Sequence, residues 1–121
     1  HEQQHFLCAL LNSYVLNALA RMLMGGHLTT RLVEGLPAPI WRGTAADRRI
    51  ARLARRLASR PAGASSRTGL IGARLQAAVA RLYGLDEATF RHVLDGFPLV
   101  PQAERDVTLK CLARRAARDA L

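Results

Sequence analysis

The chain has 121 residues, half of them apolar, and a formal net charge of +9 from 18 Lys and Arg against nine Asp and Glu. This size fits a single small domain that buries only about two-thirds of its unfolded surface, so its margin of stability is small. No run approaches the roughly 20 uncharged apolar residues of a membrane span, and no basic start with a cleavage site marks a secretion signal. We therefore expect a cytoplasmic protein with no membrane contact.

The ends and the cysteines add two expectations. The chain begins at His1 and not at Met, so we expect a segment of a longer chain. Its two cysteines, Cys8 and Cys111, lie far apart in the sequence and inside apolar helical patterns. We predict that both are reduced and buried as small hydrophobic residues, because a pair so placed does not suggest a disulfide framework.

The first 24 residues have the pattern of one long helix from Glu2 to Met24, ended by Gly25 in the left-handed position that follows many helices. Its predicted inner face is wide, so we expect the helix to be well buried. This face comprises Leu7, Leu11, Val15, Ala18 and Met22, widened by Leu10, Tyr14 and Leu19.

Residues 26–43 depart from the helical pattern. His27, Leu28, Thr29 and Thr30 include two threonines, which favour β structure. Pro37 and Pro39 each push the preceding residue out of the α region. We expect a short strand or an irregular crossing segment here.

Two helices are predicted between residues 44 and 83. Thr44 is placed to cap the first, with Asp47 three residues later at a favourable position for the helix dipole. Its inner stripe is Ile50, Leu53, Ala54 and Leu57. After a loop rich in breakers at 61–66, the second helix runs to about Tyr83 and stops at Gly84. Its inner residues are Ile71, Leu75, Ala78 and Leu82.

Two more helices complete the expected fold. Asp86 is placed to cap one that ends at Gly96, with Leu85 and Phe90 at the two positions of a hydrophobic staple. Pro101 begins the last helix at a position that tolerates proline, and its inner residues are Leu109, Leu112 and Ala116. The predicted fold is mainly α, with about five helices in one compact bundle-like domain over residues 1–121. It includes at most a small β element near residues 27–40.

The positive charge is concentrated in one of these helices. Residues 42–60 hold seven arginines against the single acid Asp47, and so carry +6 of the net +9. Lys110 is the only lysine in the chain, and arginine binds phosphate as a planar fork. The charge therefore predicts an anionic partner, first nucleic acid and then an acidic protein or membrane surface. Genomic codon bias toward Arg and Ala is the alternative source of these arginines.

The arginines fall in rows on the predicted helix. Like charges at i, i+4 repel by a few tenths of a kcal/mol, and no acid follows Asp47 to relieve them. A polyanion would relieve this repulsion, whereas a solvated face is the alternative. We predict contact with the phosphates of duplex DNA, and with a groove edge around residues 27–30. The candidate nucleic-acid-binding residues are Arg42, Arg48, Arg49, Arg52, Arg55, Arg56, His27, Thr29 and Thr30.

No motif in the sequence indicates catalysis. The Asn-Pro-Pro-aromatic motif that holds a flipped adenine is absent, and so is a glycine-rich loop after a strand for S-adenosylmethionine. The serines and carboxylates show no catalytic pairing. His1, His5 and Cys8 share one helical face, but zinc sites usually need four well-organised ligands, so we predict no metal site. We assign no catalytic residue and no cofactor to this chain.

Two stretches resemble a known family. Leu10-Leu11-Asn12-Ser13-Tyr14-Val15 with Arg21, followed by Gly26-His27-Leu28-Thr29-Thr30 and Leu36-Pro37-Ala38-Pro39, resembles the target-recognition region of modification methylases, including TaqI-like specificity domains. Leu82-Tyr83-Gly84-Leu85, Phe90 and Phe97-Pro98 resemble the tail of single-chain restriction-methylases. The resemblance implies a parent enzyme that methylates adenine in duplex DNA with S-adenosylmethionine. Residues 1–43 would end its specificity region, and residues 44–121 would form a helical tail.

Three functions follow as hypotheses. The leading one is a non-catalytic DNA-binding segment of such a methyltransferase or restriction-methylase. The second is a structural module that docks on the methylase domain of the parent, with its arginines facing protein carboxylates. The third is an unrelated helical oligomerisation domain, which would make the chain a homo-oligomer.

Overall fold

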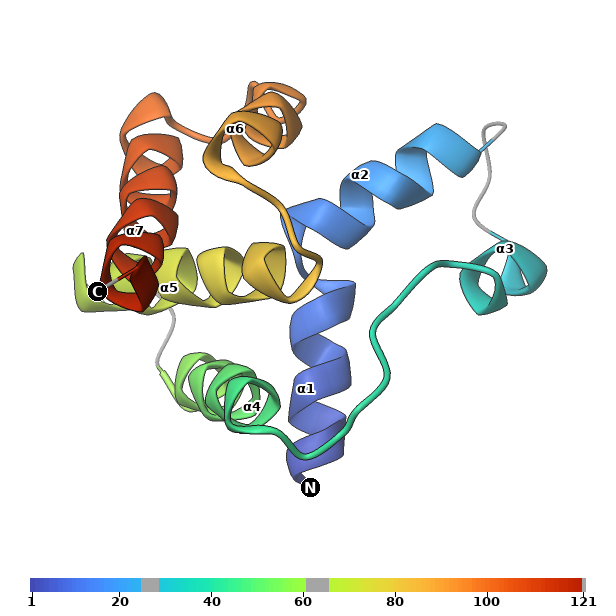
Figure 1. Ribbon diagram of the computed structural model, residues 1–121. Helices are drawn as coiled ribbons and strands as arrows, with labels where there is room; N and C mark the ends of the chain where they lie inside the picture. The colour runs from blue at the N-terminus through green and yellow to red at the C-terminus, as the bar shows by residue number, and fades with distance from the viewer. Residues whose placement is uncertain (25–28, 61–65, 121) are drawn as a thin grey trace.

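The computed structural model describes residues 1–24, 29–60 and 66–120, and within these ranges the chain forms seven α-helices and no strand. Figure 1 shows α5 through the middle of the molecule, with α4 below it, α6 above it, and α1 and α7 across its two ends. The predicted mainly α fold is confirmed. The helices are α1 (Glu2–Leu11), α2 (Tyr14–Leu23), α3 (Thr30–Glu34), α4 (Ala45–Ala58), α5 (Ser66–Leu82), α6 (Glu87–Asp95) and α7 (Gln102–Ala120).

The central helix α5 belongs to both hydrophobic cores. On one side, Ile71, Leu75 and Val79 pack with buried residues of α1 and α4, such as Phe6 and Ile50. On the other side, Ala77 and Ala80 pack with α2, α6 and α7 through Val15, Phe90, Leu94, Leu109 and Leu112. The buried residues of α5 therefore pack with helices on both of its sides. Ala116, predicted on the inner face of α7, lies outside the described side chains.

The predicted single helix over residues 2–24 is wrong, because the chain breaks at Asn12 and Ser13 into α1 and α2, whose axes differ by 56°. The hydroxyl of Ser13 caps α2 by accepting from Leu16 N at 3.1 Å, and it donates to Leu10 O at 2.7 Å. Gln76 of α5 reaches both helices, accepting from Tyr14 N and donating to Asn12 O. These bonds satisfy backbone groups that a helix break otherwise leaves without partners.

The break changes which face of the first helix is buried. Phe6, Ala9 and Leu10 of α1 are buried, whereas Leu7 and Leu11 are 53% and 49% exposed. Met22 of α2, also predicted to face inward, is 80% exposed. A continuous helix keeps one phase along its length, and the break at Ser13 resets that phase, so the predicted stripe was wrong at these three positions.

Residues 29–43 contain a helix where a strand or an irregular crossing was expected. Thr30–Glu34 form the short helix α3, and the segment from Leu36 to Gly43 is extended and irregular, as the two prolines predict. Trp41 lies edge-on to Phe6 with 5.3 Å between the ring centroids, which attaches this segment to α1. Gly25, His27 and Leu28 lie outside the described residues, as does the loop at 61–65.

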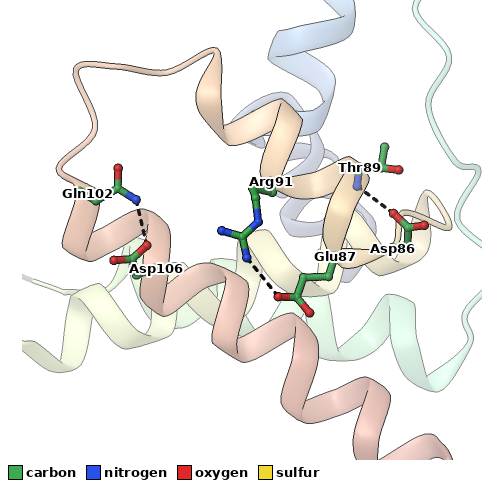
Figure 2. A network of polar contacts seen from close by, with 6 residues as sticks. All are labelled: Asp86, Glu87, Thr89, Arg91, Gln102 and Asp106. Atoms are coloured by element: carbon green, nitrogen blue, oxygen red, sulfur yellow. Dashed lines mark hydrogen bonds and ion pairs between the residues drawn. The ribbon is translucent and has the colours of Figure 1, made fainter.

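The predicted ends of α5 and α6 are confirmed. Gly84 adopts a φ of 77°, and the bonds Gly84 N to Arg81 O and Leu85 N to Ala80 O close α5 in a Schellman motif. One carboxylate oxygen of Asp86 then accepts from Thr89 N at 2.8 Å and caps α6. Figure 2 shows this cap beside the Arg91–Glu87 ion pair on the surface of the same helix.

The loop between α6 and α7 packs against α2. The guanidinium of Arg21 lies over the ring of Phe97, 4.2 Å from its centroid, and donates to Gly96 O at 2.9 Å. Tyr14, at the start of α2, packs with its ring centroid 5.0 Å from that of Phe97. These contacts give Arg21 and Phe97 a structural role in the fold.

The two cysteines differ in exposure. Cys111 on α7 is half-buried, but Cys8 on α1 is exposed, so the predicted burial of Cys8 is wrong. Cys8 lies on the same outward face as Leu7 and Leu11, because the break at Ser13 allows α1 to turn Phe6 and Leu10 inward instead. The side-chain amide of Asn12 donates to the Cys8 carbonyl at 2.8 Å and lies 3.5 Å from its sulfur.

Candidate nucleic-acid interface

The arginine-rich helix α4 begins with a rigid cap. Thr44 accepts from Asp47 N at 3.1 Å, and Asp47 Oδ2 accepts in return from Thr44 N at 3.3 Å, which forms a capping box. The same oxygen accepts from Arg42 N at 2.8 Å. Asp47 is only 2% exposed, and Gly43 before the cap has a φ of 69° that favours glycine. The start of α4 is therefore fixed by local chemistry, as Thr44 and Asp47 predict.

The inner and outer faces of α4 follow its sequence pattern. At about 100° of rotation per residue, the stripe at Ile50, Leu53 and Ala54 faces one way and the arginines face the other. The stripe is buried against α1 and α5, and Leu57 packs at its edge. We call the opposite surface the α4 arginine face. It comprises the exposed residues Arg48, Arg52, Arg55 and Arg56.

The α4 arginine face carries charge without internal compensation. Within the described part of the chain, none of its four guanidinium groups forms a hydrogen bond or an ion pair. Neighbours at i, i+3 and i, i+4 repel each other there, because each arginine stays charged at any relevant pH. Such a face gains from an anion that bridges neighbouring guanidinium groups, and phosphate oxygens match the arginine fork.

The structure separates Arg49 from this face. Arg49 is half-buried on the flank of α4 that turns toward α5, where it lines a cavity of about 280 Å³ between α4, α5 and α7. We call this the arginine cavity. Four arginines line it together with small and apolar residues, and the described lining contains no acid. The lining residues are Arg49, Leu70, Arg74, Ala77, Ala78, Arg81, Cys111 and Arg114.

Sequence reasoning did not single out Arg74, Arg81 and Arg114. Arg74 and Arg81 are seven residues apart on α5, which places them on one face two turns apart, with Ala77 and Ala78 between them. That small-residue gap between two arginines was the available signal. Arg114 comes from α7, so only the packing of α7 on α5 brings it to the cavity.

The remaining predicted residues lie apart from α4. Thr29 and Thr30 are exposed at the start of α3, which packs against α2, and Figure 1 shows α3 well separated from α4. His27 is outside the described residues. Arg42 precedes the cap of α4, and its side chain is exposed. The structure thus gathers the arginines near α4 but does not place the two threonines beside them.

Metal sites and membrane spans are the other features that bear on function. Among the described residues, no group of three or more His, Cys, Asp or Glu is arranged to hold a metal ion. Over these residues, no single helix is long and apolar enough to cross a membrane, and only α1 and α2 taken together reach that length and composition. Comparisons with protein-family models, curated proteins and solved structures find no match to this chain.

Proposed function

We propose that this chain is a helical module that binds duplex DNA, and that the α4 arginine face contacts its phosphates. The observation that carries the proposal is the set of four exposed guanidinium groups with no partner in the described ranges. Phosphate contacts fix the position of a protein on the duplex without reading its sequence. A helix face held by a capping box with a buried carboxylate and by two flanking helices is a rigid platform for such contacts.

The proposed setting is the C-terminal part of an adenine-specific DNA methyltransferase or restriction-methylase. The resemblance of the two stretches supports this setting, in which the catalytic and S-adenosylmethionine-binding groups belong to the rest of the parent enzyme. For this chain alone we propose no catalytic activity. Its task would be to hold the duplex while the methylase domain acts.

The test is a salt series of binding between the purified chain and a labelled duplex of mixed sequence. The variant R48Q/R52Q removes two charges from the α4 arginine face, and R31Q/R91Q removes two exposed arginines from α3 and α6, one of them paired with Glu87, as a control of equal net charge. Gln is nearly as good a helix former as Arg, so both variants should stay folded.

We expect R48Q/R52Q to bind every duplex more weakly. The slope of log affinity against log salt should become shallower by about 0.9 for each phosphate that the variant no longer neutralises. The control should keep the affinity and the salt slope of the unsubstituted chain. Equal binding by R48Q/R52Q and the control would show that the proposal is wrong. Failure of the unsubstituted chain to bind duplex DNA at low salt would show the same.

A docking module is the second candidate, and exposed apolar side chains favour it. Leu7, Leu11, Met22 and Leu23 on α1 and α2 are between 49% and 80% exposed. A partner that covers them would gain about 25 cal/mol for each Å² of apolar surface removed from water. Size-exclusion chromatography of the unsubstituted chain and of L7Q/L11Q tests self-association. If the unsubstituted chain is a dimer and the variant is a monomer, docking through these side chains is favoured. If both are monomers, the homo-oligomer hypothesis is wrong.

A further inference from the structure

A cavity of about 490 Å³ lies where the first turns of α7 meet α5 and the start of α2. We call it the glycine cavity. Its volume falls within the range of about 300–1,000 Å³ that is typical of sites for small ligands. Its lining residues belong to the described part of the chain, and most of them are apolar or small. They are Tyr14, Gly69, Leu70, Gly72, Ala73, Gln76, Ala103, Glu104, Val107 and Thr108.

Two glycines in the wall of this cavity are not required by the described fold. Gly69 and Gly72 lie three residues apart in α5 without a positive φ, and a Cβ atom added to either would meet nothing within 4 Å. By contrast, Gly84 has a φ of 77°, and a Cβ atom on Gly96 would lie 3.2 Å from Val93 O. Glycine inside a helix is destabilising relative to alanine, because it loses more conformational freedom on folding. A ligand that lies against the backbone of α5 would account for both glycines.

Glu104 is the only charged residue among those that line the glycine cavity. Its carboxylate is exposed, and it forms no hydrogen bond or ion pair with the described part of the chain. Tyr14 is half-buried, and burial, followed by the charge of Glu104, raises the pKa of its phenol. The carboxylate and the phenol therefore interact electrostatically.

The other two polar side chains in the lining already have partners. The amide of Gln76 bonds to Tyr14 N and Asn12 O, and the Thr108 hydroxyl donates to Glu104 O at 2.8 Å. The groups left for a ligand are the carboxylate, the phenolic hydroxyl and an apolar wall, and they are complementary to an apolar molecule with one positive charge. The N-terminus of α7 alone would favour an anion, but its dipole amounts to about half a charge, whereas Glu104 carries a full one.

We propose that the glycine cavity binds a small organic ammonium compound, whose apolar body lies against Gly69 and Gly72 and whose ammonium group pairs with Glu104. The ammonium donates charge-assisted hydrogen bonds to the carboxylate, and the apolar body displaces water from Leu70 and Val107. This site goes beyond the proposed function and does not depend on DNA binding by the α4 arginine face.

The test is a titration of the isotope-labelled chain with phenethylamine, followed by nuclear magnetic resonance of the backbone amides. Phenylpropanoate has a similar apolar body with the opposite charge, and ethylamine has the same charge without the aromatic ring. We expect phenethylamine to shift the amide signals of Gly69 and Gly72 to saturation. The other two compounds should bind at least about fivefold more weakly, because each lacks one of the two interactions.

Two variants with matched controls locate the site. Glu104→Gln removes the charge of the carboxylate, and Asp106→Asn makes the same change of charge on α7 outside the cavity. Gly72→Leu fills the cavity from α5, and Ala88→Leu adds a leucine at an exposed position of α6. We expect Glu104→Gln to weaken phenethylamine binding about fivefold, as the loss of a strong exposed ion pair does, and Gly72→Leu to abolish it. Both controls should bind as the unsubstituted chain does.

The outcomes that overturn the inference are specific. One is the absence of a saturable shift of Gly69 and Gly72 up to about 50 mM phenethylamine, several times the dissociation constant expected for so few atoms. Equal binding of phenylpropanoate and phenethylamine, or equal binding by Glu104→Gln and Asp106→Asn, overturns the pairing with Glu104. Unchanged binding in Gly72→Leu places the compound elsewhere. Should Gly72→Leu fail to fold, the comparison of Glu104→Gln with Asp106→Asn still decides the inference.

Discussion

The phenolic hydroxyl of Tyr83, at the end of α5, donates a hydrogen bond to the carbonyl oxygen of Pro37, with 2.9 Å between the two oxygens. Pro37 lies in the extended segment that leads from α3 to the cap of α4. The bond thus attaches this segment to the central helix. Both residues have a structural task in the fold.

Removal of this bond should have a small but measurable effect. Tyr83→Phe keeps the ring and deletes the hydroxyl, so the free energy of unfolding should fall by about 0.5 kcal/mol, the lower end of the range for one hydrogen bond, since the bond is exposed to solvent. Urea unfolding followed by circular dichroism measures the change. An unchanged midpoint would mean that the bond adds nothing to the stability of the domain.

Alkaline pH should destabilise the domain through its two tyrosines. Burial raises the pKa of Tyr83 above its usual 10.0, and burial followed by the charge of Glu104 raises the pKa of Tyr14. Above the unfolded pKa, the unfolded chain releases these protons while the native state retains them, so stability falls as the pH rises through the folded pKa values.

The measurement compares the urea midpoint at about pH 9 and about pH 11, on either side of the usual tyrosine pKa. The unsubstituted chain should lose stability over this interval, and the variant Y14F/Y83F should lose less. A steeper loss in the variant than in the unsubstituted chain would contradict the assignment of this pH dependence to the two phenols.

The phase of α1 can be tested with two leucines three residues apart. Leu10 is 1% exposed and Leu7 is 53% exposed. Leu10→Ala should lower the free energy of unfolding by about 2–5 kcal/mol because it opens a cavity in the core. Leu7→Ala should change it by less than about 0.5 kcal/mol, as surface substitutions do. Thermal unfolding of the two variants side by side measures both, and the opposite order would show that Leu7, and not Leu10, faces the core.

The capping box of α4 should be worth more than an ordinary cap. Thr44→Ala should cost about 1 kcal/mol, the usual value for loss of a capping side chain. Asp47→Ala should cost more, about 1–3 kcal/mol, because the backbone N–H groups of Arg42 and Thr44 lose their shared acceptor. Chemical denaturation gives the order of the two variants. A smaller effect for Asp47→Ala than for Thr44→Ala would show that water replaces this carboxylate at little cost.

Local chemistry in the sequence determined much of this protein. Thr44, Gly84 and Asp86 set helix ends through hydrogen bonds between residues at most five positions apart, and such bonds do not depend on the rest of the fold. The outward direction of Arg48, Arg52 and Arg55 also follows from the sequence, because the apolar stripe of α4 and the helical period fix both faces at once.

Only the tertiary structure decided the rest. Gln76 of α5, more than 60 positions away, supplies the partners that stabilise the break at Asn12 and Ser13, and no local pattern could place it there. The arginine cavity likewise depends on three helices meeting, because Arg49, Arg81 and Arg114 are far apart in the sequence and no spacing rule connects them. Short-range hydrogen bonds and the helical period depend on residues that are close in the sequence, whereas contacts between helices depend on how the whole core packs.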